Sequence, residues 1–142
     1  MTKITAPKRY WLMKSEPDVY GWDDLIAEGE GTWDGVRNYT ARLNLRAMSV
    51  GDAVFFYHSN IGVEIVGVAK VSKGPFQDPT DDTGRWTSVK VKPVKKLKRP
   101  VTLKEIKADP ALAEMELLTK FRLSVSEVRE SEWQHILKLA AK

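Results

Sequence analysis

The chain has 142 residues, with 23 Lys or Arg and 19 Asp or Glu, so its formal net charge is +4. This length suits one domain, and we predict a single domain over residues 1–142. The absence of cysteine excludes disulfides, thiolate nucleophiles and Cys-ligated zinc. No apolar run approaches the roughly 18 residues of a membrane-spanning helix, and the N-terminus lacks the apolar stretch of a signal peptide. We therefore expect a protein of the cytoplasm, or of the nucleus in a eukaryote, with no membrane partner.

The positive charge is concentrated in one segment. Residues 83–104 carry eight basic side chains and no acidic one, whereas the rest of the chain has a net charge of −4. A clustered basic stripe on a nearly neutral body attracts an anionic polymer such as nucleic acid. The alternative is a solvated strand edge, because lysines also discourage edge-to-edge pairing of sheets. On the first interpretation, phosphate groups would contact Arg85, Lys90, Lys92, Lys95 and Lys96.

The first third of the chain predicts a strand and two helices. Large apolar and aromatic residues over Arg9–Ser15 predict a buried strand, which ends at Glu16-Pro17 because the residue before a proline avoids helix. We predict a short helix over Trp22–Glu28 and a turn over Thr32–Gly35. Apolar residues at helical spacing predict an amphipathic helix over Asn38–Met48.

The centre of the chain predicts three strands. The apolar segments Asp52–Ser59 and Val63–Lys73 predict two strands joined by a short hairpin-like gap. Gly74–Gly84 is rich in Gly, Pro, Asp and Thr, which predicts a loop whose Asp81 and Asp82 are solvated surface. Thr87–Lys92 alternates apolar and polar residues, so it predicts a half-buried strand whose lysines face solvent.

The last third returns to helices. Thr102 and Glu105 fit a capping box that opens a short helix, and a further helical stretch is predicted from Pro110 through Leu118. Residues 123–128 predict a last strand, and apolar residues from Trp133 mark a C-terminal helix packed by one face. The whole pattern predicts an α+β fold, as a small β-barrel or curled sheet with peripheral helices.

Five tryptophans are a high count for this length. Trp11, Trp22 and Trp133 lie in apolar periodic segments, which favours a place in the core. Trp33 differs because it has polar neighbours on both sides, and it is either a core residue or one wall of a ligand pocket. Aromatic walls are one means by which proteins hold an unstacked base.

Polar residues follow the apolar strands or open a helix. Lys14, Ser15 and Glu16 end the first strand, His58 and Ser59 end another, and Arg37 and Asn38 precede a helix, as the printed sequence shows. Ser and Asn side chains can hydrogen-bond a base edge, and Lys and Arg can neutralise phosphate. Each also has a local interpretation, since Ser15 can shape a turn and Asn38 can cap its helix.

Catalytic and metal-binding motifs are lacking. The sequence has no phosphate-binding glycine loop, no HExxH and no Gly-x-Ser-x-Gly. His58 and Ser59 are adjacent, so in a strand they point to opposite faces, which does not suit a base and its nucleophile. With two histidines and no cysteine, we expect no metal and no cofactor. The sequence alone therefore gives poor support to a catalytic arrangement.

Several long motifs resemble those of the EVE domain family. They are YWLMKSEP (Tyr10–Pro17), WDGVRNYTAR (Trp33–Arg42), MSVGDAVFFYHSN (Met48–Asn60), GVAKV (Gly67–Val71), RWTSVKVKPV (Arg85–Val94) and RLSVSEV (Arg122–Val128). The likeness covers nearly the whole chain in order, and within the family the chain is similar to the thymocyte nuclear protein group and its bacterial counterparts.

The resemblance implies a PUA-like fold, which is a pseudo-β-barrel of mixed strands with peripheral helices, akin to the YTH and ASCH domains. It also implies a module that binds nucleic acid carrying a modified base, such as 5-methylcytosine or 5-hydroxymethylcytosine in DNA, or a modified base in RNA. We expect a monomer. The residues that the resemblance carries over as ligand-binding are Lys14, Ser15, Glu16, Trp33, Val36, Arg37, Asn38, Tyr39, His58, Ser59 and Arg122.

The roles implied for these residues differ. Trp33 would stack on the extruded base, and Ser15, Asn38 and Ser59 would read its edge. Lys14, Arg37 and Arg122 would contact phosphate or a polar base atom. The loop over residues 75–84 is shorter than the Asp- and Tyr-rich loop of many family members, so its contacts with a partner would differ.

Two alternatives stay open. The first is a small enzyme acting on a nucleotide, an RNA or an amide, by analogy with ASCH relatives, with Lys14 and Glu16 as acid–base residues. The second is a module whose pocket holds a small metabolite or a peptide. The second alternative predicts that salt barely changes the affinity for the ligand, because few phosphate charges are involved.

Overall fold

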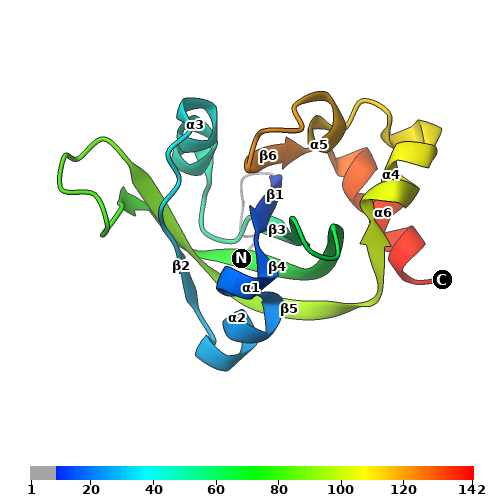
Figure 1. The fold of residues 1–142 in the computed structure, drawn as a ribbon, viewed down its shortest axis with the longest axis horizontal. Coiled ribbons are helices and arrows are strands. Elements are labelled where there is room, and N and C mark those ends of the chain that lie inside the picture. Colours follow the sequence, from blue (N-terminus) through cyan, green and yellow to red (C-terminus); the bar gives the residue numbers. More distant parts are fainter. Residues whose placement is uncertain (1–8) are drawn as a thin grey trace, which may run out of the picture.

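One sheet of six strands organises the chain (Figure 1). The computed structural model describes residues 9–142. The strand order is β2-β5-β4-β3-β1-β6, and every neighbouring pair is antiparallel except β1 and β3, which run parallel. The strands are β1 (Tyr10–Ser15), β2 (Gly31–Trp33), β3 (Ala53–His58), β4 (Glu64–Gln77), β5 (Thr87–Thr102) and β6 (Val125–Val128).

The helices lie around this sheet. They are α1 (Pro17–Tyr20), α2 (Trp22–Glu28), α3 (Tyr39–Ala47), α4 (Leu103–Ala108), the 3-10 turn η1 (Pro110–Leu112), α5 (Glu116–Thr119) and α6 (Glu130–Ala140). In Figure 1, α4, α5 and α6 gather on one side of the molecule and α3 lies on the side of β2. Among residues 9–142, no helix has the length and apolar character needed to cross a membrane.

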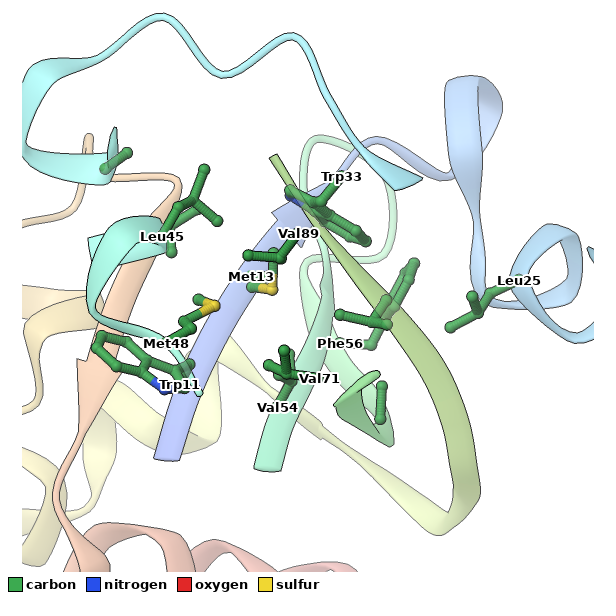
Figure 2. Close-up of a cluster of buried hydrophobic side chains, with 14 of the residues drawn as sticks. Trp11, Met13, Leu25, Trp33, Leu45, Met48, Val54, Phe56, Val71 and Val89 are labelled. Atoms are coloured by element: carbon green, nitrogen blue, oxygen red, sulfur yellow. The ribbon is translucent and has the colours of Figure 1, made fainter. Parts of the chain in front are cut away.

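Two hydrophobic clusters form because successive side chains of a strand point to opposite faces of the sheet. On β1 and β3, the side chains of Trp11, Met13 and Phe56 join one cluster with α2, α3 and β2. The side chains between them, such as Leu12 and Phe55, join a second cluster with α4, η1 and α6. Figure 2 shows the first cluster, which includes Trp33.

Most predicted elements are confirmed. The helix over Trp22–Glu28 has the predicted bounds, and α3 begins one residue after Asn38, which caps it. The capping box of Thr102 and Glu105 opens α4. The predicted core positions of Trp11, Trp22 and Trp133 are also confirmed, since all three are buried. The α+β class is confirmed as well, and the sheet is open, with β2 and β6 at its edges.

Three predicted segments are wrong in part. The segment predicted as a turn at Thr32–Gly35 contributes to β2, a strand too short for a periodic pattern to be visible in the sequence. The predicted loop Gly74–Gly84 begins with strand, because β4 continues to Gln77 in register with β5. The helix predicted from Pro110 through Leu118 is split into η1 and α5, because Met115 adopts an extended backbone and is buried in the second cluster.

Candidate nucleic-acid site

A cavity of about 660 Å³ lies between the end of β1 and the edge strand β2. Lys14 and Ser15 of β1 and Thr32 and Trp33 of β2 line it, although the two strands are not neighbours in the sheet. The cavity therefore occupies a gap that the open sheet leaves between these strands. One edge of β2 pairs with β5, and its other edge has no strand partner within residues 9–142.

The structure brings together seven of the predicted ligand-binding residues in this cavity. They are Lys14, Ser15, Glu16, Trp33, Val36, Arg37 and Asn38. They come from the end of β1, from β2 and from the segment that joins β2 to α3. Their ligand-binding role stays a prediction, because their presence in one cavity does not identify what binds there.

Ser15 and Tyr20 are joined by a hydrogen bond in the cavity wall. The Ser15 hydroxyl donates to the backbone carbonyl of Tyr20 at 2.6 Å. This hydrogen bond agrees with the local interpretation, in which Ser15 shapes a turn. With its hydrogen used in this way, the Ser15 oxygen can still accept a hydrogen bond. The Tyr20 hydroxyl donates to Glu28 Oε1 at 2.5 Å, and burial together with this carboxylate raises the pKa of Tyr20 above its ordinary range.

Asn38 has a structural role that leaves one group free. Its Oδ1 accepts a hydrogen bond from the Ala41 N–H at 3.0 Å, so it is the N-cap of α3. An amide side chain has a carbonyl oxygen and an NH₂ group, and the cap uses the oxygen. The NH₂ of Asn38 thus remains as a donor at the cavity wall.

Trp33, which the resemblance implies would stack on the extruded base, is mostly buried. It is 7% exposed, and it meets the rings of Tyr20 and Phe56 almost at right angles. Most of the indole therefore belongs to the first hydrophobic cluster, where Figure 2 shows it close to Val89. The remaining exposed part forms cavity wall, and stacking of a base on Trp33 stays a prediction.

The segment from Trp33 to Asn38 is held by a buried carboxylate. Asp78 is fully buried and accepts hydrogen bonds from the Gly35 N–H at 2.7 Å and from Arg37 Nη1 at 3.0 Å. Thr80 donates to the other oxygen from its N–H and its hydroxyl, each at 2.7 Å. Although burial alone would raise the pKa of Asp78, the hydrogen bonds from Thr80, Arg37 and Gly35 lower it below the ordinary value.

Lys14 is fixed at the border of two cavities. Its Nζ donates to the Phe121 carbonyl at 2.7 Å, and burial lowers the pKa of Lys14. Besides the main cavity, Lys14 lines an adjoining apolar one of about 520 Å³ together with Tyr57 and Phe121. Glu16 is exposed, and no ion pair joins it to Lys14.

Four predicted ligand-binding residues lie outside the main cavity. His58 Nε2 accepts a hydrogen bond from the Trp22 N–H at 3.0 Å, so this ring orients the start of α2. The Ser59 N–H donates to the Ser15 carbonyl and thereby extends the β1–β3 ladder. Tyr39 is 64% exposed and does not line the main cavity, and Arg122 lines a neighbouring cavity that Asn38 also lines.

The basic stripe is wider than the sequence suggests. Lys90 and Lys92 lie on the face of β5 opposite to the buried Val89 and Val91. The register of β4 and β5 sets Lys73 opposite Lys90 and Lys70 opposite Lys92. Residues directly opposite in an antiparallel pair share a face, so four lysines gather there. Farther along, Lys95 and Lys96 are exposed, and so is Arg85, which precedes β5.

Several lining residues were missed by the sequence analysis. Tyr20, Glu28, Glu30, Thr32, Asp34 and Ser124 also line the main cavity. The acidic residues among them, Glu28, Glu30 and Asp34, have the appearance of solvated helix or turn residues in the sequence, because their sequence neighbours do not show that they line a cavity. The prediction that Asp81 is solvated surface is wrong, since it is buried and accepts hydrogen bonds from the N–H groups of Thr83, Arg85 and Trp86.

Metal ligation finds no support in the described part of the chain. Within residues 9–142, no group of three or more His, Asp or Glu side chains is placed to hold a metal ion. The polar groups that line the cavity are hydroxyl, amide, carboxylate, ammonium and guanidinium groups, which suit a polar organic ligand.

Comparison with known proteins gives one family. The model of the EVE domain matches residues 9–139. Thymocyte nuclear protein 1 of Mus musculus is 38% identical over 164 aligned residues, which cover 92% of this chain and 73% of the relative.

Two solved structures show the same fold. An NMR structure of a Rhodopseudomonas palustris protein has 47% identity and a TM-score of 0.89, with 94% of this chain and 93% of that one covered. The crystal structure of the human THYN1 protein in complex with DNA containing 5-methylcytosine has 34% identity and a TM-score of 0.86, with 95% and 99% covered. The match to the EVE domain model, over residues 9–139, includes every residue that lines the cavity.

Proposed function

The chain belongs to the EVE domain family, and on that basis we propose that its main cavity holds one modified base extruded from nucleic acid. The observation that carries the proposal is the cavity between β1 and β2, in a fold that matches a protein crystallised with DNA containing 5-methylcytosine. Extrusion costs a few kcal/mol, which stacking and hydrogen bonds in a pocket can offset.

The free hydrogen-bonding groups of the cavity suit a base with an exocyclic amine. The Ser15 oxygen can accept, and the carboxylates of Glu16 and Asp34 can accept as well. The Asn38 NH₂ can donate to a ring nitrogen or a carbonyl. Cytosine presents an amine donor next to such acceptors, and carboxylates are natural partners of its N4 amine. We therefore favour a modified cytosine over a modified thymine or uracil.

Discrimination against the unmodified base will be modest if the modification is a methyl group. Burial of one methyl group is worth about 0.8 kcal/mol, or roughly a fourfold preference. The apolar wall available to it comes from Val36, Val19 and the exposed part of Trp33. The remaining affinity comes from phosphates on the basic face, so it falls steeply as salt rises.

We assign no catalytic role to the cavity. Lys14 is bound to the Phe121 carbonyl and makes no ion pair with Glu16, so the acid–base pair of the enzyme alternative is not assembled. For the compartment, we propose the cytoplasm, or the nucleus in a eukaryote. For the assembly state, we propose a monomer.

Fluorescence anisotropy tests the proposal. Labelled DNA and RNA oligonucleotides carry cytosine, 5-methylcytosine or 5-hydroxymethylcytosine at one position, and each is titrated at two salt concentrations. The variant Trp33→Phe changes the cavity wall, and Trp22→Phe is the matched control, because Trp22 packs on the same Phe56 ring but does not line the cavity. We expect tighter binding to one modified base, and we expect Trp33→Phe but not Trp22→Phe to weaken that preference.

Two results would contradict the proposal. One is equal affinity for all bases with both variants behaving as the parent protein, which would leave the lysines alone as the binding surface. The other is binding of a small molecule whose affinity does not change with salt, which would favour the metabolite alternative.

A further inference from the structure

Two aromatic rings pack together on the surface beside the cavity. Tyr39 is the first residue of α3 and Trp86 immediately precedes β5, and their ring centroids lie 5.4 Å apart at an angle of 34°. The guanidinium carbon of Arg42 lies 4.8 Å from the Tyr39 centroid and 5.3 Å from the Trp86 centroid. We call Tyr39, Trp86 and Arg42 the stacking platform. Its outermost ring is Tyr39, which is 64% exposed.

Several arginines lie around the platform. Arg42 and Arg46 both donate to the backbone carbonyl of Arg85, at 2.9 and 3.3 Å, and the side chain of Arg85 is exposed. Within residues 9–142, none of these three arginines has a carboxylate within ion-pair distance. Arg42 Nε is also buried without a hydrogen-bond partner. Two aromatic rings with one unpaired arginine over them are suited to a base and its phosphate.

The platform is continuous with the cavity. Arg37 lines the cavity, and its guanidinium carbon also lies 5.4 Å from the Trp86 centroid. Asn38 lines the cavity, and Tyr39 is the next residue in the chain. A strand whose base occupies the cavity would therefore bring a neighbouring nucleotide over the platform.

We propose that the stacking platform binds the base next to the one held in the cavity, with the phosphate between them on Arg42 and Arg85. This inference rests on the proposed function, and it identifies the ligand as a strand with an unpaired neighbour rather than as a lone base. Stacking on an aromatic side chain accepts any base, so the platform adds affinity without reading sequence.

The test uses a single-stranded DNA oligonucleotide with 5-methylcytosine at its centre, and the same oligonucleotide with the base removed at each flanking position in turn. Tyr39→Ala removes the exposed ring, and Leu43→Ala is the matched control, since Leu43 is an exposed apolar residue of the same helix outside the platform. We expect Tyr39→Ala to weaken binding of the intact oligonucleotide roughly fivefold or more, and Leu43→Ala to leave it unchanged. On one of the two abasic oligonucleotides, Tyr39→Ala should have no further effect.

The outcomes separate the platform from the cavity. If Tyr39→Ala binds the intact oligonucleotide as well as Leu43→Ala does, or weakens the intact and both abasic probes equally, the platform inference is wrong. If the variant shows the expected pattern while cytosine and 5-methylcytosine bind equally, the platform stands and the proposed base reading fails. Circular dichroism of each variant confirms that differences in affinity do not come from unfolding.

Discussion

The carboxylate of Asp78 lies 2.7 Å from the backbone nitrogen of Gly35, although 43 residues separate them in the chain. This bond joins the loop between β4 and β5 to the segment between β2 and α3. Gly35 has φ of +77°, a left-handed conformation that favours glycine, and its N–H points at the carboxylate. The buried carboxylate of Asp78 thus holds Gly35 and Arg37 in the wall of the main cavity, although Asp78 itself does not line the cavity.

Asp78→Asn should lower stability, because an amide cannot accept from Gly35, Arg37 and Thr80 as the carboxylate does. Hydrogen bonds to a charged group are worth about 1.5–3 kcal/mol, and Arg37 is partly exposed, so we expect a loss of about 2 kcal/mol. The melting temperature should fall by about 5–8 °C. Asp82→Asn is the control, since Asp82 is exposed in the same loop. Equal melting temperatures for the two variants would contradict the prediction.

Gly67→Ala should destabilise the contact between α2 and the sheet. A Cβ atom at Gly67 would lie 2.6 Å from the ring of Trp22, and this ring also packs against the ring of Phe56. Overpacking of this kind costs about 1–3 kcal/mol. Gly74→Ala, in the same strand, is the matched control, because a Cβ there meets no atom within 4 Å. Urea unfolding should show a lower midpoint for Gly67→Ala alone, and a parent-like midpoint for this variant would refute the close packing.

His58 should make stability depend on pH. Burial lowers the pKa of His58 from 6.5, and this outweighs the opposing effect of Glu64 and Asp23. As the pH falls, the unfolded chain binds the His58 proton at a higher pH than the folded protein does. The contribution of neutral His58 to stability is therefore fully present above pH 6.5 and declines as the pH falls below it. Protonation also removes the Nε2 acceptor of the Trp22 N–H.

Thermal unfolding between pH 5 and 8 measures this effect. His58→Gln cannot titrate in this range, so its melting temperature should fall less steeply below pH 6.5 than that of the parent protein. His135→Gln is the matched control for the loss of an imidazole, because it leaves His58 in place. A parent-like slope in His58→Gln would show that His58 does not cause the dependence.

How far the sequence alone leads depends on whether a feature is local. The helix over Trp22–Glu28 and the capping box at Thr102 are local patterns, and the structure has both. The three residues of β2 have too little periodicity to show a strand, and they become one by pairing with β5. The extension of β4 to Gln77 likewise depends on its partner, because β5 offers a matching length of strand.

The site divides in the same way. The resemblance of the motifs to the EVE family predicted that Lys14, Ser15 and Trp33 belong to one site, and in the structure all three line the main cavity. The support from Asp78 could not be predicted, since only the folded loop brings it to Gly35. The pairing of Lys70 with Lys92 could not be predicted from the sequence either, because register shifts between β4 and β5 determine which lysines lie opposite each other.

The lysine face should set the salt dependence of binding. Lys90 and Lys92 share a face with Lys73 and Lys70, and the nearby carboxylate of Glu30 offsets part of the repulsion between these like charges. For single-stranded DNA, the logarithm of affinity falls with the logarithm of salt by about 0.7 for each phosphate contact. The double variant Lys90→Ala with Lys92→Ala should therefore reduce the slope by about 1.4. Lys138→Ala, on the exposed face of α6, is the control and should leave the slope unchanged. Anisotropy titrations from about 50 to about 300 mM salt measure the slope for each variant. An unaltered slope in the double variant would show that the phosphates do not contact Lys90 and Lys92.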